Sequence, residues 1–297
     1  MTLRDEVLRR VELAVGGAQL RTMERAVALA AGVRPDVTPD GVAFAWRPHK
    51  RGLPLACVHG FGGDKETWLM MSALIPRSRG TVLIDLPGHG DSADVPETAC
   101  SIRDHAEAVL RVLDRCGHDR VILCGNSMGG GVALRLAASW PDRIAGLVLV
   151  ASVGRDVHDG GARSWADGEN PLIPRPEDIE RFMDLVLERP PPVGKAVIRY
   201  VITQRAYRAD QLHKLFRGFI QNAGERGVPS DLRAIDQQTL IIHGEQDRII
   251  SKSVAEDLVA HLPRSELVVM RGVGHAPQLE APRTTAKIIE HFAQRLG

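Results

Sequence analysis

The sequence is poor in aromatic residues, in cysteine and in long apolar runs. Aromatic residues make up 4% of its 297 residues. No C-x-x-C pair occurs, so we expect reduced, structural thiols rather than disulfides at all four cysteines, which are Cys57, Cys100, Cys116 and Cys124. No stretch approaches the ~20 apolar residues of a membrane-spanning helix. The charged, periodic N-terminus is unlike a signal peptide, so we expect a cytoplasmic protein.

The chain also lacks an excess of charge of either sign. It has 38 basic and 37 acidic residues, for a net charge of +1. A nucleic-acid-binding protein would present a basic face, so we expect no nucleic-acid partner. Metal-ligand patterns of the H-E-x-x-H or C-x-x-C kind are missing as well. We therefore expect neither a metal nor another cofactor.

What the sequence does contain is an alternation of short apolar runs and helical segments. Most of the runs are continuously apolar, as strands buried on both faces of a parallel sheet are. We expect strands at 42–46, 53–58, 81–86, 120–124, 144–150, 239–243 and 266–270. We expect helices near 66–76, 101–116, 128–139, 252–262 and 281–295. The pattern predicts an α/β fold with a mostly parallel central sheet and helices on both faces, built from residues 32–153 and 233–297.

The N-terminal segment, residues 1–31, is predicted to be helical. Apolar residues of 3–15 fall on one face, and Gly16-Gly17 then predicts a break before a second helix over 18–31. Such helices pack on a domain, dock on a partner or lie on a membrane surface. We expect packing, because the polar faces carry both signs of charge and do not suit a strongly anionic membrane.

The alternation of strands and helices fails over residues 154–232. This stretch holds several prolines and half of the twelve aromatic residues, with predicted helices at 177–188, 194–203 and 209–220. We interpret it as a helical cap, or lid, over a pocket. The alternative is a helical insertion that only enlarges the core.

The segment LCGNSMGGGVAL, residues 123–134, predicts a serine nucleophile at Ser127. An apolar strand runs directly into a glycine, and a helix of small residues follows. A G-x-S-x-G turn between strand and helix is strained, so glycines are needed at both flanks, and it presents the serine at the sheet edge. The alternative is a glycine-rich loop with an ordinary serine.

A serine nucleophile needs a base and an acid that orients the base. His275 follows the last predicted strand, and Asp247 follows the strand before it, so both belong to the same sheet edge as Ser127. The order Ser127, Asp247, His275 is the one that this architecture requires. Two rival acids are less well placed: Asp85 precedes the serine, and Asp236 lies before its strand. Glu280 is expected at the start of the last helix.

The oxyanion of such a reaction needs two N–H donors. We assign one to the backbone of Met128, directly after the serine. We assign the other to Phe61 in the loop HGFGG, residues 59–63. This loop lacks the Lys-Ser/Thr of a phosphate-binding loop and the G-x-G-x-x-G spacing, so we discount nucleotide binding.

Taken together, the motifs HGFGGDKETW, IDLPGHGDS, GNSMGG, HGEQDRII and GVGHAPQLEAP resemble those of α/β-hydrolases of the serine esterase and lipase type. The resemblance covers about 41–152 and 233–295, and it is nearest to bacterial lipases and the monoacylglycerol lipase branch. It implies an α/β-hydrolase fold and cleavage of carboxylic esters beneath a cap. GNSMGG also resembles the elbow of hydrolases that cleave carbon–carbon bonds in ring-opened aromatic metabolites, although Ala276 stands where those often have an aromatic residue.

We therefore expect a serine esterase that acts on small to medium acyl esters, of which a monoacylglycerol is one, through an acyl-enzyme. An apolar acyl pocket is expected from Met128, Leu172, Phe182, Phe216 and Phe219. Two alternatives stay open. One is a carbon–carbon bond hydrolase, and the other is a non-catalytic receptor for small molecules on the same fold.

Overall fold

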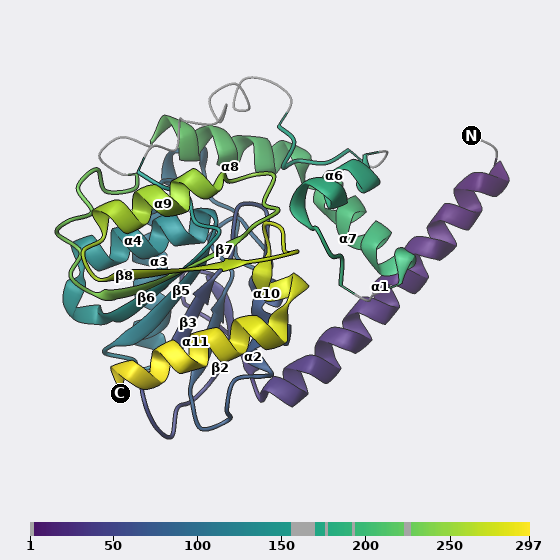
Figure 1. The fold of residues 1–297 in the computed structure, drawn as a ribbon. Coiled ribbons are helices and arrows are strands. Elements are labelled where there is room, and N and C mark those ends of the chain that lie inside the picture. Colours follow the sequence, from purple (N-terminus) through teal and green to yellow (C-terminus); the bar gives the residue numbers. More distant parts are fainter. Residues whose placement is uncertain (1–2, 156–169, 176–177, 192–193, 223–226) are drawn as a thin grey trace.

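The chain forms one eight-stranded sheet with helices on both faces (Figure 1). The computed structural model describes residues 3–155, 170–175, 178–191, 194–222 and 227–297. The strand order is β1-β2-β4-β3-β5-β6-β7-β8, and only β1 and β2 run antiparallel to their neighbours. The strands are β1 (Arg34–Val37), β2 (Ala43–Arg47), β3 (Leu55–Val58), β4 (Thr81–Ile84), β5 (Val121–Asn126), β6 (Ile144–Val150), β7 (Gln238–Gly244) and β8 (Ser265–Met270). The predicted α/β fold with a mostly parallel sheet is confirmed.

The parallel strands β3 to β7 bury both of their faces, whereas the edge strand β8 is partly exposed. Along β3, Ala56 and Val58 belong to one hydrophobic core, whereas Leu55 and Cys57 belong to the other. This explains the continuous apolar runs, because every second side chain enters a different core. All four cysteines are free thiols.

Helices complete each core. The first core is covered by α3 (Ile102–Arg115), α4 (Met128–Ser139), α8 (Ala209–Gln221) and α9 (Lys252–His261). The second core is covered by α2 (Leu69–Ser72) and α11 (Pro282–Leu296). The described ranges also contain α6 (Ile179–Val186), α7 (Lys195–Tyr207), α10 (Pro277–Glu280) and the short 3-10 helices Lys65–Trp68, Glu97–Ala99 and Pro141–Arg143.

The strand order contains a switch point at β3. Strand β3 pairs with β4 on one side and with β5 on the other. The connections that leave β3 and β5 therefore run in opposite directions across the sheet, and open α/β sheets bind ligands beyond the carboxyl ends of the strands at such a point. The HGFGG loop follows β3 and Ser127 follows β5, so both predicted elements lie at the switch point.

The N-terminal helix differs from the prediction. A single helix, α1 (Leu3–Ala31), runs through Gly16 and Gly17 without a break, and its first turns project away from the rest of the molecule (Figure 1). A Cβ on Gly16 would lie 2.1 Å from the carbonyl oxygen of Ala196, and one on Gly17 would lie 2.8 Å from the ring of Tyr200. The two glycines therefore let α7 approach α1 closely, and this packing offsets their helix propensity, about 1 kcal/mol per residue worse than that of alanine.

One strand of the sheet was not predicted from the sequence. The edge strand β1 was not predicted, because RPDV is polar, mostly exposed and contains a proline, which suits only an edge position. The helices α6, α7 and α8 lie close to the predicted ranges, and we call these three the cap helices after the predicted cap. Their role as a lid over a pocket stays a prediction. No helix within the described ranges is both long and apolar enough to span a membrane.

Candidate active site

Ser127 sits on a strained turn between β5 and α4. Its backbone has φ 54° and ψ −119°, and Ala151 is the only other non-glycine residue with positive φ in the described chain. The turn depends on its two glycines. A Cβ on Gly125 would lie 2.2 Å from the carbonyl oxygen of Gly129, and a Cβ on Gly129 would lie 2.4 Å from that of Val58. The residues of G-x-S-x-G thus form the sharp strand-to-helix turn that the sequence predicted.

Asp247 and His275 form a hydrogen-bonded pair at the same sheet edge. The Asp247 carboxylate oxygen Oδ2 lies 2.8 Å from His275 Nδ1, and Oδ1 accepts from the amides of Ile249 (2.8 Å) and Ile250 (3.0 Å). Burial alone would raise the pKa of Asp247, but the nearby His275 and these hydrogen bonds outweigh it and leave the pKa below its usual range. Because the ionised carboxylate only accepts, Nδ1 of His275 carries the proton of this hydrogen bond, and Nε2 is not engaged by Asp247.

The backbone of His275 is held from three directions. Its amide donates to Val186 in α6 (3.0 Å), and its carbonyl accepts from the side chain of Asn126 (3.3 Å), the residue before Ser127. The carboxylate of Glu280 accepts from the amides of Gly274 (3.0 Å) and Ala276 (3.3 Å) on either side of the histidine. These contacts bring the loop of His275 to the turn of Ser127. No hydrogen bond joins the Ser127 hydroxyl to the His275 ring among the described residues.

The HGFGG loop lies directly against Ser127. A Cβ on Gly60 would be 3.0 Å from the Cβ of Ser127. His59 Nε2 accepts from the amide of Leu86 (3.0 Å), so its Nδ1 must carry the proton and donate to the carbonyl of Gly60 (2.7 Å). Burial also lowers the pKa of His59, which keeps the ring neutral. Since the peptide is trans, holding the Gly60 carbonyl turns the N–H of Phe61 to the opposite side.

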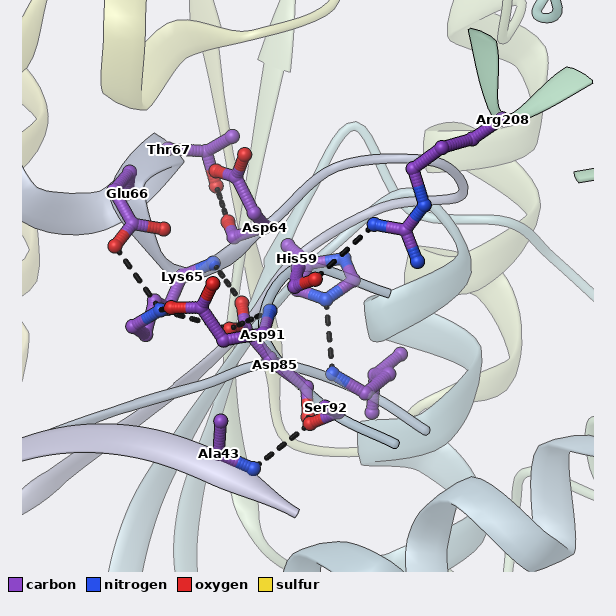
Figure 2. Close-up of polar contacts among 12 residues, drawn as sticks. Ala43, His59, Asp64, Lys65, Glu66, Thr67, Asp85, Asp91, Ser92 and Arg208 are labelled. Atoms are coloured by element: carbon purple, nitrogen blue, oxygen red, sulfur yellow. Dashed lines mark hydrogen bonds and ion pairs between the residues drawn. The ribbon is translucent and has the colours of Figure 1, made fainter. Parts of the chain in front are cut away.

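An ion cluster built on the buried pair Lys65 and Asp85 anchors the segment that follows this loop (Figure 2). The Lys65 ammonium lies 2.8 Å from Asp85, 2.7 Å from Asp91 and 3.1 Å from Glu66. Asp85 also accepts from the backbone amides of Lys65 (2.6 Å) and Asp91 (2.9 Å). The rival acid Asp85 is therefore engaged in structure. The other rival, Asp236, has a side chain 85% exposed near Arg264.

A family model described as "Alpha/beta hydrolase family" matches residues 55–288, which are most of the chain. The chain belongs to the alpha/beta hydrolase family. The predicted α/β-hydrolase fold is thereby confirmed, and a lipase among the relatives confirms the resemblance to lipases.

Several known proteins are similar to this hydrolase. Lipase 3 of a Moraxella species is 28% identical over 86% of the chain and 82% of its own length. A 2-hydroxymuconate semialdehyde hydrolase of Pseudomonas putida is 29% identical over 89% of the chain and 92% of its length. An acetyltransferase component of an acetoin cleaving system from Pseudomonas putida is 31% identical over 77% of the chain, but the hydrolase spans only 60% of that relative. A solved structure described as a membrane phospholipase A has a TM-score of 0.84 and 28% identity, over 99% of this chain and 95% of that one.

Two of the predicted pocket residues, Phe216 and Phe219, form a chain of rings with Phe61, and two others, Leu172 and Phe182, contact Arg205. The ring of Phe61 lies 5.0 Å from that of Phe216, and Phe216 lies 6.1 Å from Phe219. On the other side, the guanidinium of Arg205 lies 5.0 Å from the ring of Phe182 and donates to the carbonyl of Leu172. Met128 is buried at the start of α4. The acyl pocket itself stays a prediction.

Sequence reasoning missed three residues that shape this site. Asn126 occupies the second position of G-N-S-M-G, and its spacing next to the serine is the only signal in the sequence. Glu280 was expected in the last helix, but it ends the separate helix α10 and binds the His275 loop and the amides of Glu188 and Arg189. Arg205 carries no sequence motif. No metal-binding cluster of His, Cys, Asp and Glu occurs among the described residues.

Proposed function

We propose that the chain is a serine hydrolase of carboxylic esters, with Ser127 as nucleophile, His275 as base and Asp247 as its orienting acid. The observation that carries the proposal is the Asp247–His275 hydrogen bond, made from the loop that is tied through Asn126 to the Ser127 turn. The family membership supports a hydrolase, and the lipase and phospholipase among the similar proteins support an ester substrate.

The proposed reaction has two steps. Ser127 attacks the ester carbonyl while His275 Nε2 takes the hydroxyl proton and passes it to the leaving alcohol. Water, deprotonated by the same nitrogen, then attacks the acyl-enzyme and releases the acid. Asp247 stays ionised throughout and stabilises the imidazolium that forms in each step. The chemistry requires no metal or other cofactor.

The amides of Phe61 and Met128 are proposed to hold the oxyanion. Neither N–H donates a hydrogen bond to any other residue in the described ranges. The Met128 amide is the first of α4, where the helix leaves N–H groups unpaired and favours negative charge. The Phe61 amide is turned away from His59 by the fixed Gly60 carbonyl. We place the acyl chain against Met128 and the cap residues Leu172, Phe182, Phe216 and Phe219.

A panel of p-nitrophenyl esters of increasing acyl length tests the ester proposal. Wild type should show a burst of p-nitrophenol equal to the enzyme concentration, and Ser127→Ala should lose turnover by several orders of magnitude, because no alkoxide equivalent remains. Ester turnover that survives in Ser127→Ala would refute the assignment. Binding of an ester without any acyl-enzyme would favour a small-molecule receptor.

The second candidate is hydrolysis of a carbon–carbon bond, because a 2-hydroxymuconate semialdehyde hydrolase is among the relatives. The same serine, histidine and oxyanion donors suit that reaction. We would compare kcat/KM for a p-nitrophenyl ester with that for a vinylogous diketone acid. A higher kcat/KM for the diketone acid than for the ester would refute the ester proposal in favour of carbon–carbon bond hydrolysis.

A further inference from the structure

Arg205, at the last turn of α7, joins the cap helices to the loop of Phe61. Its Nη2 donates to the carbonyl of Phe61 (3.0 Å), and its Nη1 donates to the carbonyl of Gly62. The opposite edge of the guanidinium donates to the carbonyl of Leu172 from Nε (3.0 Å) and Nη2 (2.8 Å). One flat side chain thus connects two segments that are more than 100 residues apart in the chain.

The fit around the guanidinium is close. One face stacks over the Phe182 ring at 5.0 Å. Gly62 has φ +65°, and a Cβ there would lie 2.3 Å from Arg205 Nη2. A glycine at this position therefore allows the guanidinium to reach both carbonyls, and its own backbone has the freedom to adopt other conformations. Burial lowers the pKa of Arg205 to about 10, so the side chain remains cationic at neutral pH.

The two peptide units that flank the Phe61 α-carbon are held by different parts of the molecule. His59, in the core, fixes the carbonyl of Gly60. Arg205, in the cap, fixes the carbonyls of Phe61 and Gly62. The Phe61 N–H belongs to the first peptide unit, and the amide of Gly63 also donates to the Gly60 carbonyl (3.0 Å), which links the two units in one turn. Among the described residues, the carbonyl of the second unit accepts a hydrogen bond only from Arg205.

We propose that Arg205 is a positioning residue that holds the HGFGG loop in the conformation in which the Phe61 N–H meets the oxyanion. This inference rests on the serine-hydrolase function proposed above. In the described part of the chain, every hydrogen bond of Arg205 goes to a backbone carbonyl, so it acts through the loop. Removing it frees the Phe61–Gly62 segment, and an interaction that is made in the transition state is lost while ground-state binding is kept.

Steady-state kinetics on a p-nitrophenyl ester test this role. Arg205→Met should lower kcat about 10- to 100-fold and change KM by less than about twofold. Arg205→Lys keeps the charge but lacks the planar fork of donors, so its kcat should fall between those of wild type and Arg205→Met. The Ki of a trifluoromethyl ketone, whose tetrahedral adduct bears the oxyanion, should rise by the factor by which kcat/KM falls.

Arg208→Met is the matched control. Arg208 also joins the cap to the core, but it donates to the carbonyls of Gly88 (3.0 Å) and Gly90 (3.1 Å), which lie outside the HGFGG loop. The kcat of Arg208→Met should stay within about twofold of the wild-type kcat. If Arg205→Met fails to fold, the changes in kcat and in KM relative to wild type are measured on Arg205→Lys alone.

Two outcomes would overturn the inference. An unchanged kcat in the Arg205 variants would show that the loop keeps its conformation without the guanidinium. A raised KM with unchanged kcat would show that Arg205 binds the substrate directly. Labelling of Ser127 by a fluorophosphonate distinguishes a failure of the positioning role from a failure of the proposed serine-hydrolase function. Wild type that is not labelled refutes the serine-hydrolase proposal, whereas labelled wild type with fully active Arg205 variants refutes only the positioning role.

Discussion

The two oxygens of Asp247 have separate partners. Oδ1 is held by the amides of Ile249 and Ile250, and Oδ2 accepts from His275. The same side chain is therefore both fixed to its own loop and hydrogen-bonded to the proposed base. His243 adds a second imidazole, with Nε2 3.9 Å from Oδ2 and no hydrogen-bond partner among the described residues. Burial lowers the pKa of His243, so it lies beside the carboxylate as a neutral ring.

The substitution Asp247→Asn tests whether the Asp247 carboxylate orients His275. The amide of Asn can donate to His275 Nδ1 and so favour the wrong tautomer, and in the well-studied serine-protease triad the equivalent change lowers kcat about 10⁴-fold. We expect a loss of that order in ester turnover, with the fold retained. The exposed Asp236→Asn should retain full kcat. Equal activity of the two variants would remove Asp247 from the mechanism.

The lowered pKa of Asp247 also predicts how stability depends on pH. Since its folded pKa lies below the ordinary 3.8, ionisation of Asp247 stabilises the folded state above that value, and the contribution is lost as the pH falls through the folded pKa. Urea midpoints of wild type should therefore drop on the acid side more steeply than those of Asp247→Asn. Parallel curves for the two proteins would contradict the assigned direction.

Helix α1 shows how a tertiary contact overrides local propensity. Two adjacent glycines predict a break in any isolated helix, yet here they are the residues that permit contact with Ala196 and Tyr200 on α7. The sequence contains no sign of a partner helix some 180 residues later, so the continuous helix was not predictable. The strands were predictable because burial on both faces leaves an apolar run whatever the partners are.

Gly16→Leu should separate α1 from α7. The added side chain starts 2.1 Å from the carbonyl oxygen of Ala196, so one helix must move, and we expect unfolding to become easier by about 1–3 kcal/mol despite the better helix propensity of leucine. The control is Ala18→Leu, at an exposed position of the same helix, which should change stability by less than about 0.5 kcal/mol. Chemical denaturation measures both, and a neutral Gly16→Leu would mean that the two helices do not stay packed in solution.

Some residues of the candidate site could be predicted from the sequence and others could not. Ser127, Asp247 and His275 each follow a predicted strand, so their common edge could be inferred from the alternation of strands and helices. Asn126, Glu280 and Arg205 bind backbone atoms of distant segments. A carbonyl or amide is present at every residue and leaves no trace in the sequence, so these contacts required the fold.

The whole molecule is stabilised by two cores that share one sheet. The C-terminal helix α11 closes the second core, and Arg79 ties it to the loop before β4 through a two-point contact with Glu290 (2.8 and 3.0 Å). Phe292 in α11 is 2% exposed. The last helix is thus as much part of the core as the strands are.

Phe292→Ala should destabilise the molecule by about 3–5 kcal/mol, because it removes a buried ring and leaves a cavity between α11 and the sheet. His291→Ala, one residue earlier and exposed, should stay within about 0.5 kcal/mol of wild type. Urea unfolding at neutral pH measures the difference. A loss below 1 kcal/mol in Phe292→Ala would show that α11 can detach without unfolding the rest.

The clamp made by Arg205 has a practical consequence for redesign. Its acceptors at Phe61 and Leu172 are main-chain oxygens, which remain when the side chains there are exchanged. Positions 61 and 172 can therefore be randomised together to seek new acyl preferences while the attachment between cap and loop is kept. A library that varies position 62 or 205 would instead lose that attachment in most of its members.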